Sequence, residues 1–572
     1  MYIKKISEII NYRNLTGLTI SFNPNINFII GENNIGKTNT LELITSFFST
    51  GKFTEEDFNE ITESIKIKLI ISFSDEEIGF FEDNFDVDES NEITIEGIQE
   101  SVDERLVYYH CTPCRTKISA SIIRKINTLY YYAQRMPSKE VDFRKTSGSG
   151  KVLNYLIEHS LIQNDLSDEA IIQSDKLTSV VDNINSQIEI INKVTGDHIS
   201  AFYDIEAGRI ISRILGLGDE TGRDINLLGE GIQYAFNILL QIIEKIYSVK
   251  TSRKPEEFEN RLIITNDKKL FPLFLVLDEP EIHQHPYRQR SLIKKIKSIM
   301  RNEIPEFTIL LNNLFGIDGI MGQLFIATHS PNILSDDYRQ FIRISKTSNG
   351  LNIISGEEII IQDEKIYKHM LHNFIYLKEA MFSRGIIFIE GDTENGAIPI
   401  LAERNDYNLD ELGIGVVKLD GADGVKKCMS LYSLFNIKSV AAIDRDKETS
   451  YRGIPNIFFT NKIDFEEELY DNFKFKDYFK CCVELKKAKP LIDALINKGF
   501  RINHQTPIED ICSLQIDESL GIEIMTESKV EQLKELRHSK NAAKGSILAN
   551  FVTTVPASYL EAIQALISEE QL

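Results

Sequence analysis

The octapeptide GENNIGKT at residues 31–38 constrains the fold more than any other part of the sequence. The apolar run INFII precedes it, and KTNTLELITSFF follows with apolar residues at helical spacing, which predicts a strand, a loop and a helix in that order. Backbone N–H groups of such a loop surround a phosphate, its lysine reaches the β- and γ-phosphates, and its threonine binds magnesium. We therefore predict an α/β domain that binds ATP through Gly31, Asn34, Gly36, Lys37, Thr38 and Asn39.

Two later apolar runs end in residues that suit ATP hydrolysis. In FLVLDEPE a predicted buried strand ends at Asp278 and Glu279, and in FIATHS another ends just before His329. Two carboxylates at the end of a buried strand are costly unless a cation binds them. We expect Asp278 to hold Mg²⁺ through water, Glu279 to polarise the attacking water, and His329 to hydrogen-bond the γ-phosphate or that water.

Composition limits the class of protein. The 572 residues are 42% hydrophobic, which is enough for two or three cores. No run of 18 apolar residues occurs and MYIKKISEIINYRN lacks a signal-peptide pattern, so we expect a cytoplasmic protein with no membrane segment. Six cysteines are too few for a disulfide framework, and the CxxC of Cys111 and Cys114 lacks a second half-site for zinc, so reduced thiols are expected.

The net charge argues against one mode of nucleic-acid binding. At −22 it excludes a protein that coats nucleic acid through bulk charge, because phosphate binding depends on clustered lysine and arginine. Any contact with DNA must be local. Basic clusters occur within residues 288–301, 486–489 and 534–544, although such runs are commonly solvated helix faces.

The chain divides into five predicted segments. Several β-rich runs between residues 66 and 133 predict antiparallel strands, and spaced apolar positions predict helices over 152–215. Apolar runs at 273–279 and 324–328 resume a buried parallel sheet, and Asn349-Gly350 predicts a hairpin. The segments are a first ATPase part at 1–150, a helical dimerisation arm at 151–220, a second ATPase part at 221–365, a linker helix at 366–382 and a second α/β domain with an extension at 383–572.

A second group of carboxylates follows two further apolar runs. GIIFIEGDTE places Glu390 at a strand end with Glu394 one helical turn later, and SVAAIDRDKE places Asp444 and Asp446 at another strand end. Alternation in Asp-x-Asp directs both side chains to one side, where with Glu390 they form an oxygen-rich site suited to Mg²⁺ or Mn²⁺. Such clusters catalyse in-line phosphoryl transfer, whereas a solvated acidic turn would leave the flanking apolar strands unexplained.

The order of four motifs in the first 365 residues resembles that of ABC-type ATPases related to RecF and SMC proteins. GENNIGKT, LLGEGIQ, LVLDEPEIHQHP and FIATHSP are similar to the P-loop, signature, Walker B and switch motifs. In that family two heads sandwich ATP, so the resemblance implies that Gly229 and Gly231 of one subunit touch nucleotide on another. Gln233 also matches, but the usual serine is absent and Glu230 stands in the loop, so the sandwich is less well specified than the nucleotide site.

The second α/β domain resembles the Toprim domain of topoisomerases, primases and OLD nucleases over about residues 385–450. Glu390-Gly391 and Asp444-Arg445-Asp446 carry this resemblance, and Glu394 and KLDGADG at 418–424 are similar to the OLD type. The resemblance predicts an α/β protein in which a C-terminal Toprim domain follows an ABC-type P-loop ATPase with an inserted helical arm.

Two later motifs acquire roles only through this resemblance. It implies that IDFEEELY supplies Asp464 and Glu466 to a second metal ion, with Glu468 as an alternative. It also implies a late lysine that stabilises the transition-state phosphate. HSKNAAKGS offers Lys540 and Lys544, and we favour Lys544.

The whole arrangement is similar to the OLD family and, in length and layout, to its Gabija antiphage branch. The resemblance implies a DNA endonuclease, nicking or cutting both strands, whose ATPase regulates the nuclease, with ATP and Mg²⁺ (or Mn²⁺) as cofactors. It implies DNA, a homo-oligomer (dimer or tetramer) and a UvrD-like helicase as partners. The catalytic residues would be Glu390, Glu394, Asp444, Asp446, Lys544 and Glu279. A RecF/SMC-like repair ATPase, a topoisomerase and a nucleotide-sensing scaffold are the rival interpretations.

Overall fold

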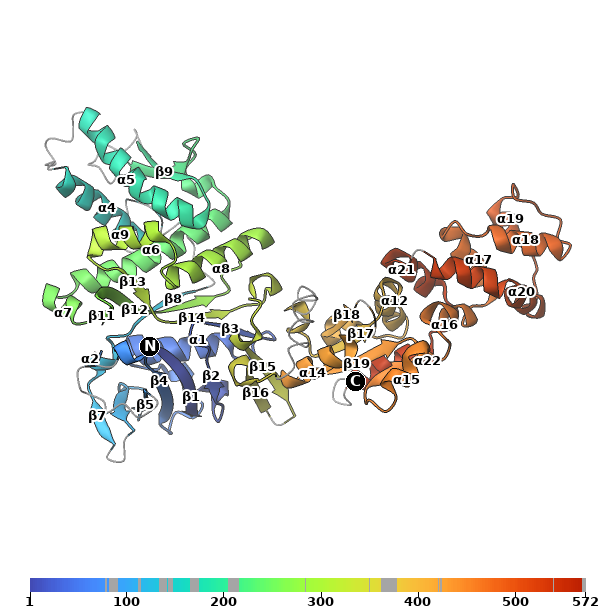
Figure 1. Cartoon of the computed structure of the whole chain (residues 1–572), viewed down its shortest axis with the longest axis horizontal. Coiled ribbons are helices and arrows are strands. Elements are labelled where there is room, and N and C mark those ends of the chain that lie inside the picture. The colour runs from blue at the N-terminus through green and yellow to red at the C-terminus, as the bar shows by residue number, and fades with distance from the viewer. Residues whose placement is uncertain are drawn as a thin grey trace. The chain divides into compact units, whose positions relative to one another are not determined.

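The computed structural model describes residues 1–77, 80–81, 91–111, 115–132, 141, 143, 148–164, 174–203, 215–282, 284–348, 350–361, 378–419, 421, 424–538 and 540–567 (Figure 1). The chain forms two compact units, Met1–Ile359 and Ile360–Leu572. Among the helices of these residues, none is long and apolar enough to cross a membrane.

The larger sheet of the first unit carries the P-loop strand. It contains β11 (Ile263–Thr265), β12 (Lys268–Asp278), β14 (Leu324–Ala327), β3 (Ile26–Gly31), β15 (Phe341–Thr347) and β16 (Gly350–Ser355) in that order, and β8 (Asn127–Tyr131) and β13 (Gly319–Met321) also pair with β12. β12, β14, β3 and β15 are parallel neighbours, so the carboxyl ends of β12 and β3 meet at one edge. β15 and β16 form the predicted antiparallel hairpin, although Asn349 lies outside the described residues.

The smaller sheet of this unit is antiparallel, as predicted for most of residues 66–133. It consists of β2 (Ile20–Ser21), β1 (Tyr2–Ile10), β4 (Ile65–Ser72), β5 (Glu92–Gln99), β6 (Val107–His110) and β7 (Thr116–Ile118). The prediction was wrong for β8, which instead runs parallel to β12 in the larger sheet. All five residues of β8 are buried, as expected of a strand that is covered on both faces.

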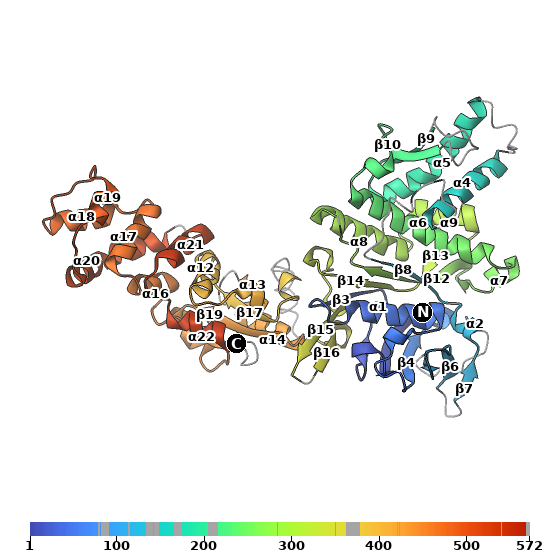
Figure 2. The same cartoon turned by 180° about the vertical axis from the view of Figure 1, so that it is seen from behind.

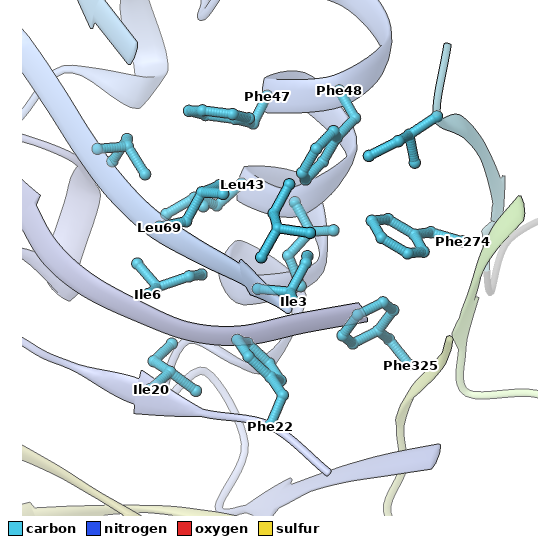
Figure 3. Packing of buried hydrophobic residues seen from close by; sticks show 14 of the residues in the cluster. Ile3, Ile6, Ile20, Phe22, Leu43, Phe47, Phe48, Leu69, Phe274 and Phe325 are labelled. Atoms are coloured by element: carbon cyan, nitrogen blue, oxygen red, sulfur yellow. The ribbon is translucent and has the colours of Figure 1, made fainter. Parts of the chain in front are cut away.

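The core of the first unit lies between these two sheets, around the helix that follows the P-loop. This helix, α1 (Lys37–Thr45), continues into a turn that carries Phe47 and Phe48. The Phe48 ring lies 5.3 Å from that of Phe274 on β12, and the Phe22 ring lies 5.4 Å from that of Phe325 on β14 (Figure 3). Because these aromatic rings are fully buried, the helix and the loop before it are held in place by the core.

Helices cover the other face of the larger sheet. They include α6 (Glu230–Thr251), α8 (Pro286–Met300) and α9 (Pro305–Phe315). Two helices of the arm, α4 (Ser149–Gln163) and α5 (Ser174–Thr195), pack against α6. This unit also contains two short helices, α2 (Ala120–Ile123) and α7 (Pro255–Glu259). In α5 the buried Val180, Ile184, Ile188 and Ile191 recur every three or four residues, which gives one apolar face.

The arm is not wholly helical, so the prediction of helices over 152–215 was wrong at its end. β9 (Ile199–Tyr203) and β10 (Leu215–Asp219) form an antiparallel pair. Asn192 of α5 donates through Nδ2 to the Ile199 carbonyl at 2.6 Å and accepts from the Ile199 N–H at 3.1 Å. Asn185 makes the same two bonds with Ala201, at 3.1 and 2.6 Å, so side chains of α5 replace a neighbouring strand.

The second unit is built on a fully parallel sheet. The strand order is β18 (Ile414–Lys418), β17 (Gly385–Ile389), β19 (Lys438–Ile443) and β20 (Ile457–Phe459). Around it lie α12 (Asp392–Glu403), α13 (Leu409–Leu412), α14 (Val425–Leu434), α15 (Glu448–Tyr451) and α22 (Ala557–Leu566). Every residue of β17 is buried, and β17 and β19 end side by side.

Further helices continue this unit after the sheet (Figure 2). They are α16 (Phe465–Asp471), α17 (Phe475–Glu484), α18 (Lys489–Asn497), α19 (Ile508–Cys512), α20 (Glu518–Arg537) and α21 (Ala542–Phe551). α21 packs closely on α12: a Cβ on Gly396 would lie 1.9 Å from the Ala542 carbonyl oxygen, and one on Gly545 would lie 1.8 Å from that of Thr393. Only glycine permits this approach, which brings the segment before α21 to the start of α12.

Several predicted features lie outside the described residues. They are residues 362–377 of the linker region, Asp420, Ala422 and Asp423 of KLDGADG, and Cys114 of the CxxC.

Candidate functional site

The P-loop adopts a conformation that only its glycines allow. Gly31 has a φ of 149°, and a Cβ there would lie 2.3 Å from the Ile344 carbonyl oxygen on β15. Gly36 has a φ of 113° at the N-cap of α1, and Asn34 also has a positive φ, of 57°. The loop therefore leads directly to a helix N-terminus, where free N–H groups favour an anion.

Lys37 is buried and bent back over the P-loop. Its Nζ donates to the carbonyl oxygens of Gly31, at 3.0 Å, and Glu32, at 2.6 Å. Burial lowers the pKa of Lys37 to about 8, although the carboxylates of Glu279 and Asp278 oppose this shift. The two carbonyl oxygens thus hold the ammonium at the position from which it can meet a phosphate.

Asp278 lies at the end of β12, next to the P-loop helix. Thr38 Oγ1 lies 3.3 Å from Asp278 Oδ2, and the Tyr130 hydroxyl donates to the same oxygen at 3.1 Å. Burial raises the pKa of Asp278 to about 6, which shows that its charge needs compensation. Tyr130 was not predicted from the sequence, where its place in the apolar run NTLYYY is the only signal.

Glu279 and His329 lie together at the same edge of the sheet. His329 Nε2 is 3.4 Å from Glu279 Oε1, and Glu279 has a φ of 49°. Glu281, which the sequence analysis did not assign, accepts from Thr328 Oγ1 at 2.7 Å and from the His329 N–H at 2.8 Å. Glu281 therefore fixes the backbone on which His329 is placed.

Asn39 and Gly231, which were also predicted to bind nucleotide, make hydrogen bonds within this chain. Asn39 Nδ2 donates to Asn14 Oδ1 at 2.8 Å, and Arg13 Nη1 donates to Asn39 Oδ1 at 2.7 Å. Gly229 is the N-cap of α6, and the Gly231 carbonyl accepts from Gln284 Nε2 at 2.9 Å. The signature residues thus lie at a helix start, as a phosphate-binding loop requires.

Glu390 and Asp444 meet at the carboxyl ends of β17 and β19. The Asp444 N–H donates to Glu390 Oε1 at 2.8 Å. Asp444 Oδ1 in turn accepts from the Phe465 N–H, at 2.9 Å, in the first turn of α16. The parallel pairing of β17 and β19 therefore brings two predicted site residues together, and the first turn of α16 adds a backbone donor to Asp444.

Glu394 and Glu466 add two deeply buried carboxylates to this pair. Glu394 is 3% exposed and Glu466 is fully buried. Burial raises the pKa of Glu394 to about 7, with a further contribution from the charge of Glu466, and burial raises that of Asp444 to about 8, with contributions from Glu394 and Glu390. The four side chains are called the carboxylate cluster: Glu390, Glu394, Asp444 and Glu466.

Three other predicted acidic residues lie outside the carboxylate cluster. Asp446 is exposed and pairs with Lys447 at 3.0 Å. Asp464 caps α16 by accepting from the Glu467 N–H at 3.0 Å. Its other oxygen accepts from Arg537 Nε at 2.6 Å.

Glu468, the predicted alternative to Glu466, is also engaged elsewhere. It accepts from the Asn461 N–H at 2.5 Å and from Ser558 Oγ at 2.7 Å. Its side chain therefore links the segment before α16 to the start of α22.

Of the two late lysines named from the sequence, Lys540 contacts the carboxylate cluster, whereas Lys544, which we favoured, has other partners. Lys540 Nζ lies 2.9 Å from Glu466 Oε2. Burial favours its neutral form, but Glu466, Glu394 and Asp444 outweigh this and raise its pKa. Lys544 instead donates to the last carbonyl groups of α20, those of Glu535, Leu536 and His538. Its place in the first turn of α21 directs it to that helix end.

The carboxylate cluster fits a divalent cation by its chemistry. Among the described residues, no three His, Cys, Asp or Glu side chains already converge on a point where they could hold a metal ion. Two buried oxygens of the cluster, Glu394 Oε2 and Glu466 Oε1, nevertheless have no hydrogen-bond partner. Unsatisfied buried carboxylate oxygens are costly, and they are the donors that Mg²⁺ and Mn²⁺ prefer.

Family models of known proteins match parts of both units of the chain. The family model described as "AAA ATPase domain" matches residues 1–147 and 117–334, and "Overcoming lysogenization defect protein-like, TOPRIM domain" matches 381–446. Endonuclease GajA of Bacillus cereus (strain HuB5-5) is 24% identical over 332 residues, which cover 49% of this chain and 45% of that protein. The chain thus spans less than half of that relative's length. RecF of Clostridium perfringens (strain SM101 / Type A) is 52% identical over 44 residues, 8% of this chain and 12% of RecF.

Parts of the chain are also similar to solved structures. An SMC head bound to the C-winged helix domain of ScpA aligns with a TM-score of 0.37 and 16% identity, over 64% of this chain and 99% of that one. The C-terminal region of the Burkholderia pseudomallei OLD protein aligns with a TM-score of 0.21 and 21% identity, over 32% of this chain and 97% of that one. The ATPase family model covers more than half of the chain, so the chain belongs to the AAA ATPase domain family, and the segment that contains the carboxyl ends of β17 and β19 matches an OLD-like Toprim domain.

Proposed function

We propose that this chain is an ATP-binding, metal-dependent DNA endonuclease whose ATPase domain regulates its Toprim nuclease. The carboxylate cluster carries the proposal, because buried acids with unsatisfied oxygens stand where the strands of an OLD-like Toprim domain end. The name of the GajA relative, an endonuclease, supports the same activity.

The carboxylate cluster would hold Mg²⁺ or Mn²⁺. Glu390, Glu394, Asp444 and Glu466 would be its ligands, and Asp446, which is exposed and pairs with Lys447, is the candidate for a second ion. When bound, such ions position the attacking water and stabilise the leaving oxygen in phosphodiester hydrolysis. Asp464 is a weaker candidate, because Arg537 and the start of α16 already satisfy its two oxygens.

Lys540 would bind the scissile phosphate. Its ammonium lies 2.9 Å from Glu466 Oε2, and three N–H donors suit the non-bridging oxygens of a phosphate. Charge on these oxygens is what a nuclease must stabilise as the bond between phosphorus and the leaving oxygen breaks. We therefore assign to Lys540 the role first predicted for Lys544.

The nucleotide site has the groups needed to bind and hydrolyse ATP. Lys37 would neutralise the β- and γ-phosphates, and Thr38 and Asp278 would hold Mg²⁺. Glu279 would orient the attacking water, with His329 at 3.4 Å able to bond the γ-phosphate or that water. Because phosphodiester hydrolysis needs no ATP energy, we assign a regulatory role to this domain.

The partners follow from the same reasoning. The signature residues Gly229 and Gly231 would complete a nucleotide site on a second copy, so a homo-oligomer, a dimer or a tetramer, is proposed, with the arm as a dimerisation element. A cytoplasmic role in antiphage defence, with a UvrD-like helicase as a further partner, is proposed from the resemblance of the sequence to the Gabija branch of the OLD family.

Plasmid cleavage by the purified chain tests the function. Supercoiled DNA should be nicked or linearised with Mg²⁺ or Mn²⁺ and remain intact in EDTA. The Glu390→Gln variant should lose this activity, and the matched surface variant Glu403→Gln, on the same α/β domain, should keep it. Cleavage by Glu390→Gln at the unmutated rate would overturn the assignment, and intact DNA under all conditions would favour a RecF/SMC-like repair ATPase or a nucleotide-sensing scaffold.

A further inference from the structure

Lys540 occupies the carboxylate cluster as its own counter-ion. Its Nζ lies 2.9 Å from Glu466 Oε2, and Glu466 is fully buried with Oε1 lacking a hydrogen-bond partner. The charges of Glu394 and Asp444 also act on this ammonium. The ammonium group of Lys540 therefore interacts electrostatically with at least three carboxylates.

An ammonium and a divalent ion are alternative ways to neutralise the same buried oxygens. A buried carboxylate without a nearby cation is strongly destabilised, so either an ammonium or a divalent ion next to Glu466 stabilises the cluster. A divalent ion that binds Glu466 competes with Lys540, because the two positive charges repel each other at such separations.

The chain around Lys540 is suited to such an exchange. Lys540 lies between α20 and α21, where the described residues 538, 540 and 541 belong to neither a helix nor a strand. Lys544 anchors the start of α21 to the end of α20, and Arg537, the last residue of α20, pairs with Asp464. Both ends of the segment are thus fixed, while the side chain of Lys540 is 40% exposed and has a path to solvent.

We propose that Lys540 is a competing counter-ion that guards the metal site: its ammonium holds Glu466 until a divalent ion replaces it, and its release then turns it toward a phosphate. This inference rests on the proposed metal-dependent nuclease and concerns the regulation of the same site. It makes metal occupancy a condition for phosphate binding by Lys540, so that the nuclease binds its substrate productively only when the metal site is loaded.

Mn²⁺ binding without DNA or nucleotide tests the proposal. Titration followed by the electron paramagnetic resonance signal of free Mn²⁺ should be done on the full chain and on Lys540→Met and Lys540→Gln. Gln keeps an N–H donor for Glu466 but has no charge. Both variants should bind Mn²⁺ at least about tenfold more tightly than the unmutated chain, because a like charge next to the site is removed.

Lys529→Met is the matched control. Lys529 is a lysine of the same unit that pairs with Glu467 at 2.9 Å and Asp471 at 2.8 Å, outside the carboxylate cluster. It should leave Mn²⁺ affinity unchanged. A Lys540 variant that unfolds in EDTA and refolds with Mn²⁺ would have the same meaning as tighter binding, because the ion then replaces the missing ammonium.

The outcomes separate this inference from the proposed function. Equal or weaker Mn²⁺ binding by both Lys540 variants, with binding still lost in Asp444→Ala, would overturn the role of Lys540 and leave the metal site intact. Mn²⁺ binding that is unchanged in Asp444→Ala would instead overturn the metal site itself, and this inference with it. An equal gain of affinity in Lys529→Met would show a general charge effect and also overturn it.

Discussion

The backbone N–H of Asp444 donates a hydrogen bond of 2.8 Å to Oε1 of Glu390. This contact joins the residues that follow two neighbouring parallel strands, β17 and β19, and both residues are acidic. A backbone donor can hold one carboxylate next to another without any cation, so the pair is preorganised before a metal ion binds.

Asp444→Asn should abolish DNA cleavage while it raises the apo thermal stability. The backbone N–H is unchanged and the Asn Oδ1 can still accept from Phe465, but the charge that burial and the neighbouring Glu394 and Glu390 disfavour is gone. Differential scanning fluorimetry in EDTA at pH 7 should show a higher Tm, by roughly 2–4 °C per kcal/mol of relieved repulsion. Asp446→Asn, at the exposed neighbouring position, should leave Tm unchanged. A lower Tm for Asp444→Asn would contradict this account.

Lys37→Ala and Glu279→Gln should separate nucleotide binding from turnover. Lys37 neutralises phosphate charge, so its removal should weaken ATP binding by at least about tenfold, whereas Glu279 acts on the water and its amide should keep the affinity. Isothermal titration calorimetry measures the affinities, and phosphate release measures the turnover. An equal loss of affinity in both variants would contradict the division of roles.

Tyr130→Phe should raise the Mg²⁺ concentration needed for ATP hydrolysis. The Tyr130 hydroxyl orients Asp278 through the 3.1 Å bond to Oδ2, and loss of one such bond, worth ~1 kcal/mol, corresponds to about a fivefold change. Hydrolysis rates measured across Mg²⁺ concentrations at saturating ATP give the value. Tyr132→Phe, which removes a hydroxyl from the half-exposed neighbour on the same segment, is the control. Identical Mg²⁺ dependence in the Tyr130→Phe and unmutated chains would rule out a role for this bond.

Lys544→Met should lower stability rather than chemistry. The carbonyl groups at the end of α20 lose their donor, which we expect to reduce the free energy of unfolding by about 1–3 kcal/mol in urea titrations. Folded Lys544→Met should still cleave DNA, and Lys540→Met should not. Lys534→Met, at an exposed position of α20, is the control for stability. If Lys544→Met is fully stable and inactive, the assignment of the two lysines is reversed.

Nucleotide binding should control cleavage without taking part in it. Asp444→Ala should therefore hydrolyse ATP at the unmutated rate, and Glu279→Gln should cleave DNA at a rate that changes with bound ATP. Cleavage time courses of Glu279→Gln with and without ATP, at fixed free Mg²⁺, measure this coupling. Superimposable time courses despite demonstrated ATP binding would show that the two domains are uncoupled.

The residues of both sites that follow directly from local order along the chain could be predicted from the sequence. GENNIGKT lies between an apolar strand and a helix, and Glu390 and Asp444 directly follow buried strands, so strand pairing alone brings each set to one sheet edge. The same local reasoning was wrong for β8 and for β9 with β10, because an apolar or β-branched run does not specify the partner that it will pair with.

Packing between segments that are distant in sequence determines which late residues reach the carboxylate cluster. Lys540 and Lys544 are four residues apart in one motif, yet close glycine packing of α21 on α12 leaves Lys540 beside Glu466 and directs Lys544 to the end of α20. Likewise Glu466 is buried in the cluster while Asp464, two residues earlier, caps α16 and pairs with Arg537. These choices depend on contacts between segments distant in sequence, and residue type and spacing carry no information on such contacts.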